Sequence, residues 1–300
     1  MGAQSYIASP SVVAYAGRNR VDLDELARKT GRTTLAREDV DMHLSGGTNG
    51  HAAMPDNARY WDIDHAAFGP VREEPVTRMA RVASTNLSAA NSMIPQVTHH
   101  DRADLRKLEA LRTSLKPEAD RRGVRLTALA FHVKALSVCL KEFPRFNASL
   151  SADGETLILK QYIHVGIAVD TPHGLMVPVL REAGRKGLWQ IAAEIADLAA
   201  RAQSRKIRPA EMGGASMSIS NLGGIGGTAF TPIVNPPELA ILGITRTELV
   251  PVREDEAWVP VPMVPLDLSY DHRVINGADA ARFMARYSRL LSDPRRMVLP

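Results

Sequence analysis

The sequence predicts a mixed α/β sheet domain preceded by a small all-α unit. From about residue 60 to residue 300, strand-like runs alternate with amphipathic helical stripes. Two of these runs are joined by the turn-forming residues 170–174, which indicates a β-hairpin. A hairpin pairs its strands antiparallel, whereas strands linked through helices pair in parallel. The sheet should therefore contain both kinds of pairing.

The small unit, residues 5–44, shows the signals of three short helices. Ser9 precedes a proline, and proline suits the first position of a helix. Asp22 and Glu25 have the spacing of a capping box, which predicts the start of a second helix. A third helix is expected over residues 37–44.

The next segment, residues 45–59, begins Ser-Gly-Gly-Thr-Asn-Gly and predicts a flexible linker, because few of its side chains could be buried. Residues 60–300 form the larger domain. Its expected helices follow apolar stripes, and its expected strands follow short apolar runs bounded by turn formers. The helices are expected at 105–115, 126–140, 188–204 and 277–291, and the strands at 156–160, 162–169, 175–180, 215–220, 239–244 and 261–269.

Composition excludes several classes of protein. A chain of 300 residues with 45% apolar and 23% charged residues is ordinary for a globular protein of about two domains. No apolar run approaches the roughly 18 residues that span a bilayer, and the first ten residues lack the features of a signal peptide. The net charge of +4 is scattered, which argues against nucleic acid as a partner. The single cysteine, Cys139, excludes an intrachain disulfide and a multi-cysteine zinc site. Because neither an apolar span nor a transit peptide is visible, the sequence predicts a cytoplasmic enzyme without a membrane partner.

A glycine motif at residues 224–229 fits G-x-G-x-x-A and follows a predicted strand. A dinucleotide site also requires a helix that begins at this motif, because the helix N-terminus holds the pyrophosphate. Pro232, Pro236 and Pro237 follow instead and exclude that helix. The motif is therefore interpreted as a loop in which backbones approach closely.

The sequence supports neither a serine hydrolase nor a metal site. No G-x-S-x-G elbow of a serine hydrolase is present. His99 and His100, with Asp101 or Asp104, form the best candidate metal cluster. Interpreted as the start of a helix, adjacent residues there do not share a face, so we expect solvated side chains and no metal site.

The segment Ser269-Tyr270-Asp271-His272-Arg273-Val274-Ile275-Asn276-Gly277 places a histidine where a strand ends and a helix begins. From the residues alone, a hydrogen-bonded structural histidine remains the default for His272. The default for Ser220 is likewise a strand-end hydroxyl that caps a loop.

The run SYDHRVINGADAARF at 269–283 resembles the signature of the dihydrolipoyl acyltransferases, the core subunits of 2-oxo acid dehydrogenase complexes. The resemblance extends through 218–223, 228–244 and 94–98 and covers about residues 60–300. It implies a chloramphenicol-acetyltransferase-like fold with acyltransferase activity, and it is most similar to the acetyl-transferring, pyruvate-type members. Residues 5–44 resemble the family's peripheral subunit-binding domain.

The resemblance implies a role for three residues. His272 matches the general base that takes the proton from the thiol of coenzyme A or dihydrolipoyl, both of which are substrates. Ser220 matches the hydroxyl that donates a hydrogen bond to the tetrahedral oxyanion. Asn276 stands where many members have aspartate, and its uncharged amide can orient its surroundings. Asp271 and Arg273 are expected to form an internal ion pair or helix-end contacts and not to act as catalytic groups.

The resemblance also implies an assembly. The chain is expected to form homotrimers with the active site between subunits, His272 and Asn276 of one chain facing Ser220 of its neighbour. Coenzyme A and the lipoyl arm would enter from opposite ends. Trimers would build a larger hollow core, which the similarity to acetyl-transferring bacterial members implies to contain 24 chains.

Two features depart from the family. The Asp-Lys pair of a lipoyl domain is absent, so the lipoyl group is expected either from another chain or from a missing N-terminal domain. In residues 5–44, Val13, Ala14 and Gly17 replace the usual arginines. Since such domains bind through complementary charge, we expect weakened or altered binding of the pyruvate decarboxylase component and of dihydrolipoyl dehydrogenase. The alternatives are a different basic patch or a helical spacer without a partner; the patch would comprise Arg18, Arg20, Lys29 and Arg32.

Two rival functions remain open from the sequence. One is a structural core subunit with little activity, and the other is a coenzyme A-dependent acyltransferase with another acceptor. Activity with free dihydrolipoamide separates all three.

Overall fold

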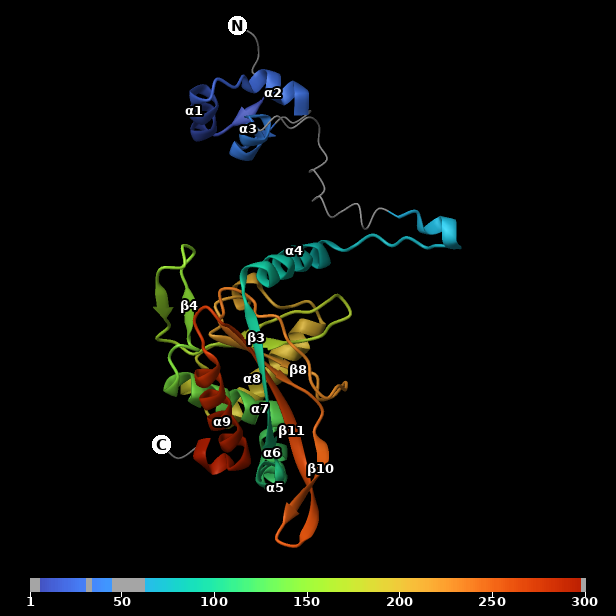
Figure 1. Cartoon of the computed structure of the whole chain (residues 1–300), viewed down its shortest axis with the longest axis vertical. Coiled ribbons are helices and arrows are strands. Elements are labelled where there is room, and N and C mark those ends of the chain that lie inside the picture. The colour runs from blue at the N-terminus through green and yellow to red at the C-terminus, as the bar shows by residue number, and fades with distance from the viewer. Residues whose placement is uncertain (1–5, 31–33, 45–62, 298–300) are drawn as a thin grey trace. The chain divides into compact units, whose positions relative to one another are not determined.

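The computed structural model describes residues 6–30, 34–44 and 63–297 and divides the chain into two compact units, residues 1–74 and 75–300 (Figure 1). The predicted linker at 45–59 and Arg32 lie outside the described residues. None of the described helices has the length and apolar character needed to cross a bilayer.

The first unit contains the three predicted helices. Ser9 caps α1 by accepting a hydrogen bond from the backbone N–H of Val12, and Asp22 accepts from the N–H of Glu25 at the start of α2. Two strands of two residues each, one before the first helix and one between the second and third, pair in parallel, so the unit is not purely α-helical. The elements are β1 (Ile7–Ala8), α1 (Pro10–Arg18), α2 (Leu23–Thr30), β2 (Thr34–Leu35), α3 (Arg37–Leu44) and the 3-10 helix η2 (His65–Phe68).

The second unit is built on a seven-stranded sheet with the order β10-β11-β9-β8-β6-β7, in which β3 also pairs with β11. β6, β8 and β9 are parallel, and the other pairs are antiparallel. This arrangement confirms the predicted mixed sheet and the hairpin β6–β7. The strands are β3 (Gln96–Asp104), β6 (Val165–Ala168), β7 (Val179–Leu180), β8 (Met217–Asn221), β9 (Ala240–Ile244), β10 (Glu248–Glu254) and β11 (Ala257–Asp271), with a separate pair β4 (Ala148–Leu150) and β5 (Leu157–Leu159).

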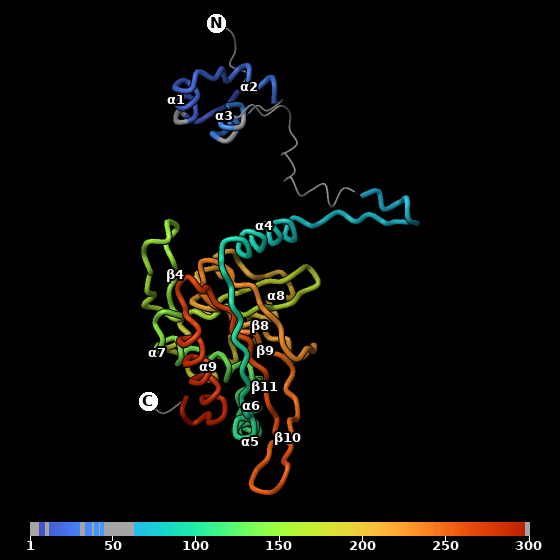
Figure 2. Tube along the Cα trace, viewed as in Figure 1, coloured from blue at the N-terminus to red at the C-terminus, as the bar shows by residue number. Residues whose placement is uncertain are grey.

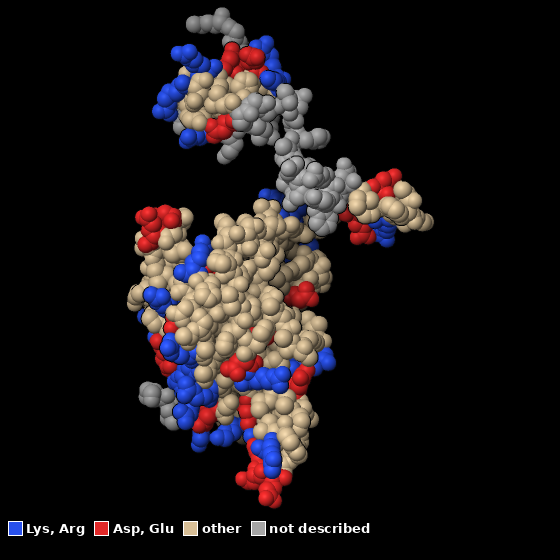
Figure 3. Space-filling model, viewed as in Figure 1, with Lys and Arg blue, Asp and Glu red and all other residues tan. Residues whose placement is uncertain are grey.

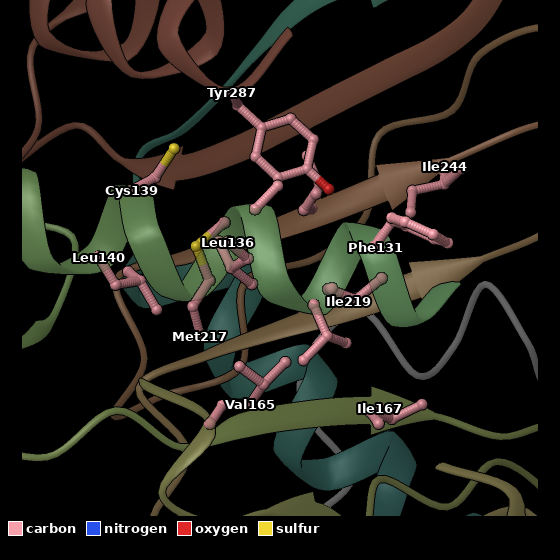
Figure 4. Packing of buried hydrophobic residues seen from close by; sticks show 14 of the residues in the cluster. Phe131, Leu136, Cys139, Leu140, Val165, Ile167, Met217, Ile219, Ile244 and Tyr287 are labelled. Atoms are coloured by element: carbon pink, nitrogen blue, oxygen red, sulfur yellow. The ribbon is translucent and has the colours of Figure 1, made fainter. Parts of the chain in front are cut away.

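Helices cover one face of this sheet. α7 is apolar on almost every side because it is enclosed between the sheet and its neighbours α8 and α9. Figure 4 shows Phe131 and Leu136 of α7 above Met217 and Ile219 of β8, all fully buried or nearly so. The helices are α4 (Arg78–Met93), α5 (Arg106–Ser114), α6 (Lys116–Arg122), α7 (Ala128–Glu142), α8 (Leu188–Gln203), α9 (Gly277–Ser292) and the 3-10 turns η3 (Ala183–Arg185), η4 (Pro209–Glu211) and η5 (Pro294–Met297).

The interpretation of His99 and His100 as the start of a helix is wrong. Both lie on strand β3, which pairs antiparallel with β11 and lies beside α9 (Figure 2). Successive side chains of a strand point to opposite faces, so the two histidines diverge. Asp101, on the same face as His99, accepts a hydrogen bond from Ser288 of α9, while His100 lies on the opposite face.

The hairpin β10–β11 extends beyond the rest of the sheet (Figure 2) and carries acidic residues at its tip (Figure 3). Strand β10 was not predicted. The prolines Pro251 and Pro260 face one another across this hairpin, and proline weakens the sequence signal of a strand because it cannot donate to the ladder.

Candidate active site

His272 lies at the end of the longest strand, β11, and is exposed. Its backbone N–H donates to the carbonyl of Pro95 at 3.1 Å, and its ring lies 5.7 Å from the ring of Tyr270. The preceding residue, Asp271, is buried and forms a two-pronged ion pair with Arg273, as expected from the sequence. Residues on both sides of His272 are therefore fixed, while its ring makes no hydrogen bond within the described residues.

Asn276 follows in the same turn. The carbonyl of Asp271 accepts from the N–H groups of Val274 and Ile275, and Asn276 then caps α9. Its side-chain oxygen accepts from the N–H of Asp279 at 2.9 Å. This bond orients the side chain and leaves its NH2 group without a hydrogen bond among the described residues. The structure thus places His272 and Asn276 in one turn between β11 and α9.

Ser220 lies near the end of β8 on the face of the sheet opposite the helices. Its strand neighbours Met217 and Ile219 belong to the core under α7, so Ser220 points the other way. It is half-buried, and its hydroxyl makes no hydrogen bond in the part of the chain that the structure describes. No contact of the hydroxyl therefore supports a loop-capping role.

Ser220 and His272 do not meet within one chain. The register pairs Ser220 with Gly243 of β9 and Gly243 with Asp267 of β11, and His272 follows five residues later. Two strand spacings of about 4.8 Å and five residues of about 3.3 Å separate the two side chains by roughly 20 Å. A site that uses both residues requires a second copy of the chain.

A loop, residues 222–238, covers the helix-free face next to Ser220. It contains the glycine motif, where Gly226 and Gly227 have φ values of 152° and 89°, and no helix follows. The loop is held by Gln96, whose side-chain oxygen accepts from the N–H of Val234 at 2.6 Å. The prediction of a loop without a following helix is confirmed.

The sequence reasoning missed a buried acid at the end of this loop. Glu238 is 7% exposed, and its Oε1 accepts from the hydroxyl of Ser218 at 2.9 Å. Its Oε2 has no partner among the described residues. Burial raises the pKa of Glu238 to about 7, and the Ser218 hydrogen bond and Lys160 oppose the shift. Glu238 directly precedes a buried apolar strand, and no periodic pattern in the sequence there indicates that this carboxyl group is buried.

A cleft of about 690 Å³ lies between α5, α7, α8 and the ends of β8 and β9. Its lining includes Asn221, two cations, Arg125 and Arg246, and Glu109, whose carboxylate is paired with Arg112. His132 also lines it; burial lowers the pKa of this histidine to about 4, and its Nδ1 is hydrogen-bonded to the hydroxyl of Tyr287 at 2.7 Å. A neutral inner part with cations beside it suits a ligand that carries phosphates at one end.

Residues 68–299 match the family described as 2-oxoacid dehydrogenases acyltransferase (catalytic domain). The chain belongs to this family. The resemblance stated from the sequence is thereby confirmed, and the mixed-sheet α/β fold class with it.

Two curated members of the family are the dihydrolipoyllysine-residue acetyltransferase components of the pyruvate dehydrogenase complexes of Cupriavidus necator and Pseudomonas aeruginosa. They are 42% and 43% identical to this chain, over 97% of it and 55% of each relative. The chain thus spans about half the length of the curated relatives it matches.

Two solved structures of family members superpose on this chain. The Azotobacter vinelandii dihydrolipoamide acetyltransferase matches with a TM-score of 0.78 and 49% identity, over 79% of this chain and 98% of that one. The study of that structure addresses the role of a serine, a histidine and an asparagine in the catalytic mechanism of the Azotobacter vinelandii enzyme. In that enzyme the serine precedes the histidine by 52 residues, and the asparagine follows the histidine by four. The cubic core of the pyruvate dehydrogenase multienzyme complex matches with a TM-score of 0.78 and 50% identity, over the same shares.

Proposed function

We propose that this chain is the catalytic core of a dihydrolipoyl acetyltransferase, which transfers acetyl between dihydrolipoyl groups and coenzyme A in a pyruvate dehydrogenase-type complex. One observation carries the proposal. Ser220, His272 and Asn276 stand 52 and four residues apart, the same intervals as the serine, histidine and asparagine of the Azotobacter vinelandii enzyme.

His272 is the general base in this proposal. It takes the proton from the thiol of coenzyme A, and the thiolate attacks the carbonyl carbon of the acetyl thioester on the lipoyl group. The tetrahedral intermediate collapses, and the leaving dihydrolipoyl thiolate takes the proton back from the imidazolium. A thiol has an ordinary pKa near 8.5, so a base near neutrality is needed, and such a base contributes about 10²–10⁴-fold.

Ser220 and Asn276 serve the same step. The hydroxyl of Ser220 donates to the oxyanion of the tetrahedral intermediate, and it is free to do so because no described residue occupies it. Asn276, fixed by its bond to the N–H of Asp279, orients the groups around the histidine without adding charge. The separation of about 20 Å within one chain supports a site formed between subunits.

We propose homotrimers that assemble into a core of 24 chains. The match to the cubic core of a pyruvate dehydrogenase complex supports this assembly. So does α4, in which only Ala90 is buried although Val82, Leu87 and Met93 are apolar and 53%, 40% and 57% exposed. Analytical ultracentrifugation of the purified chain tests it, and a stable monomer would contradict it.

The phosphate-bearing end of coenzyme A is proposed to bind in the cleft on the helix side of the sheet, whereas Ser220 faces the opposite side. Arg125 and Arg246 line this cleft, and guanidinium groups bind phosphates well. The lipoyl group is proposed to arrive on a domain that residues 1–300 do not contain. We also propose that the protein acts in the cytoplasm.

Residues 5–44 are proposed to bind the other enzymes of the complex weakly or in an altered way. Val13, Ala14 and Gly17 are exposed positions of α1 without charge, whereas Arg18 at the end of the same helix and Lys29 of α2 supply exposed cations. Titration calorimetry of the unit against the decarboxylase component and dihydrolipoyl dehydrogenase tests this, and nanomolar binding to either would contradict it.

The function is tested by acetyl transfer from acetyl-coenzyme A to free dihydrolipoamide. We expect turnover by the wild type, a loss of at least about 100-fold in His272→Ala, and no loss in His65→Ala, which removes an exposed histidine of the first unit. A folded assembly without turnover would leave a structural core subunit as the better reading. Activity retained in His272→Ala would refute the role of the base.

A further inference from the structure

A row of four paired residues, one of which is Ser220, crosses the helix-free face of the sheet. The register pairs Ser220 with Gly243, Gly243 with Asp267, and Asp267 with His100. Residues paired across neighbouring strands point to the same face. The pair His100–Asp267 therefore lies on the face that carries Ser220, separated from it by the one strand that holds Gly243.

Asp267 and His100 form a tight pair that reaches from the interior to the surface. Nδ1 of His100 lies 2.6 Å from Oδ1 of Asp267. The aspartate side chain is 1% exposed, and the histidine side chain is 51% exposed. A carboxylate so deeply buried is costly unless its oxygens are satisfied, so the histidine holds this oxygen in one orientation.

The second oxygen of Asp267 holds the loop that covers Ser220's face. Oδ2 accepts from the backbone N–H of Phe230 at 3.2 Å. The ring of Phe230 lies directly on Gly243, where an added Cβ would be 2.7 and 2.8 Å from two ring atoms. Gly243 is the strand neighbour of Ser220, about 4.8 Å away, so this ring stands next to the serine along the row.

We propose that His100 and Asp267 are positioning residues that hold Phe230 as a wall of the acyl pocket beside Ser220. This inference rests on the proposed function, because it assigns a purpose to the surroundings of the serine that meets the oxyanion. The hydroxyl of Ser220 has no hydrogen bond of its own in the described chain, so its neighbours decide where it points. In this assignment, the ring of Phe230 limits the space for an acyl chain longer than acetyl.

A double-mutant cycle tests the assignment through Ser220. Asp267→Ala is expected to lower kcat for acetyl transfer by about 10–100-fold with little change in KM, since small misplacements at a reacting centre cost up to about 100-fold. In a Ser220→Ala background, the same change should cost less than about threefold. The rate ratio of acetyl- to butyryl-coenzyme A should fall in Asp267→Ala.

Two variants serve as controls. Asp267→Asn keeps an acceptor for the N–H of Phe230 and should retain kcat within about threefold. Ser269 and Thr98 form the neighbouring row on the same face, and their side chains share a hydrogen bond of 2.8 Å. This pair binds no N–H of the loop among the described residues. Ser269→Ala should therefore also keep kcat within about threefold of the wild type. Should Asp267→Ala not assemble, His100→Ala carries the same cycle, because the histidine side chain is 51% exposed and water can replace it at the Asp267 oxygen.

Equal losses from Asp267→Ala or His100→Ala with and without Ser220 would overturn the assignment, as would a loss in Ser269→Ala as large as that in Asp267→Ala. These outcomes differ from a failure of the proposed function. In that case the wild type itself transfers no acetyl, and the assignment falls with it.

Discussion

Glu238 makes folding stability depend on pH in a defined direction. The ordinary pKa of a glutamate is 4.5, and burial raises that of Glu238 to about 7 in the folded chain. Between about pH 4.5 and pH 7, the folded state therefore keeps a proton on Glu238 that the unfolded state has released. This contribution is fully present below about pH 4.5 and is lost as the pH rises towards 7. The difference between the two pKa values corresponds to about 3 kcal/mol.

Glu238→Gln removes the charge and keeps an acceptor for Ser218. Its gain in free energy of unfolding over the wild type is expected to grow from about 1 kcal/mol at pH 5 to about 3 kcal/mol at pH 8. Urea denaturation at equal chain concentration measures it at both pH values. The control Glu155→Gln makes the same change on an exposed side chain and should show no such growth. If Glu238→Gln parallels the wild type at both pH values, the carboxylate is not desolvated as argued.

Four further predictions concern the site and the core. Ser220→Ala should lower kcat by about 10²–10³-fold with KM little changed; a drop below about threefold would remove the serine from the mechanism. Arg246→Gln should raise the KM for coenzyme A several-fold and weaken its dependence on salt, and an unchanged KM would place the phosphates elsewhere. Gly166→Ala drives a Cβ into the hydroxyl of Ser218 and should destabilise the fold by about 1–3 kcal/mol in urea denaturation. Phe283→Ala, at a ring that is fully buried, should cost about 3–5 kcal/mol by the same assay, and a cost below 1 kcal/mol would contradict the packing.

Elements with one strong local signal could be predicted from the sequence. The leucine stripe of α7 gives a period of 3.6 that persists over four turns, and turn-forming residues mark the hairpin β6–β7. His272 and Asn276 could be placed together because a short turn joins a strand to a capped helix. These signals depend on neighbours along the chain.

Features set by contacts between distant segments could not be predicted. β3 carries polar residues on both faces, since one face meets Ser288 of α9 and the other meets Asp267, so its alternation is hidden. The exposed hairpin β10–β11 is rich in proline, which weakens its strand signal. The alignment of Ser220 with His100 follows from register across four strands, and no local pattern encodes that register.

The distance between Ser220 and His272 also determines how many active sites of an assembly are lost when one chain is defective. In the proposed trimer, each chain lends its histidine to one site and its serine to another. A chain that fails to fold inactivates two active sites. A folded chain that lacks only the serine or only the histidine inactivates one. The rate of catalysis then reports how many neighbouring chains are intact. An isolated subunit, however well folded, carries a histidine and a serine without their partners and therefore has no complete site.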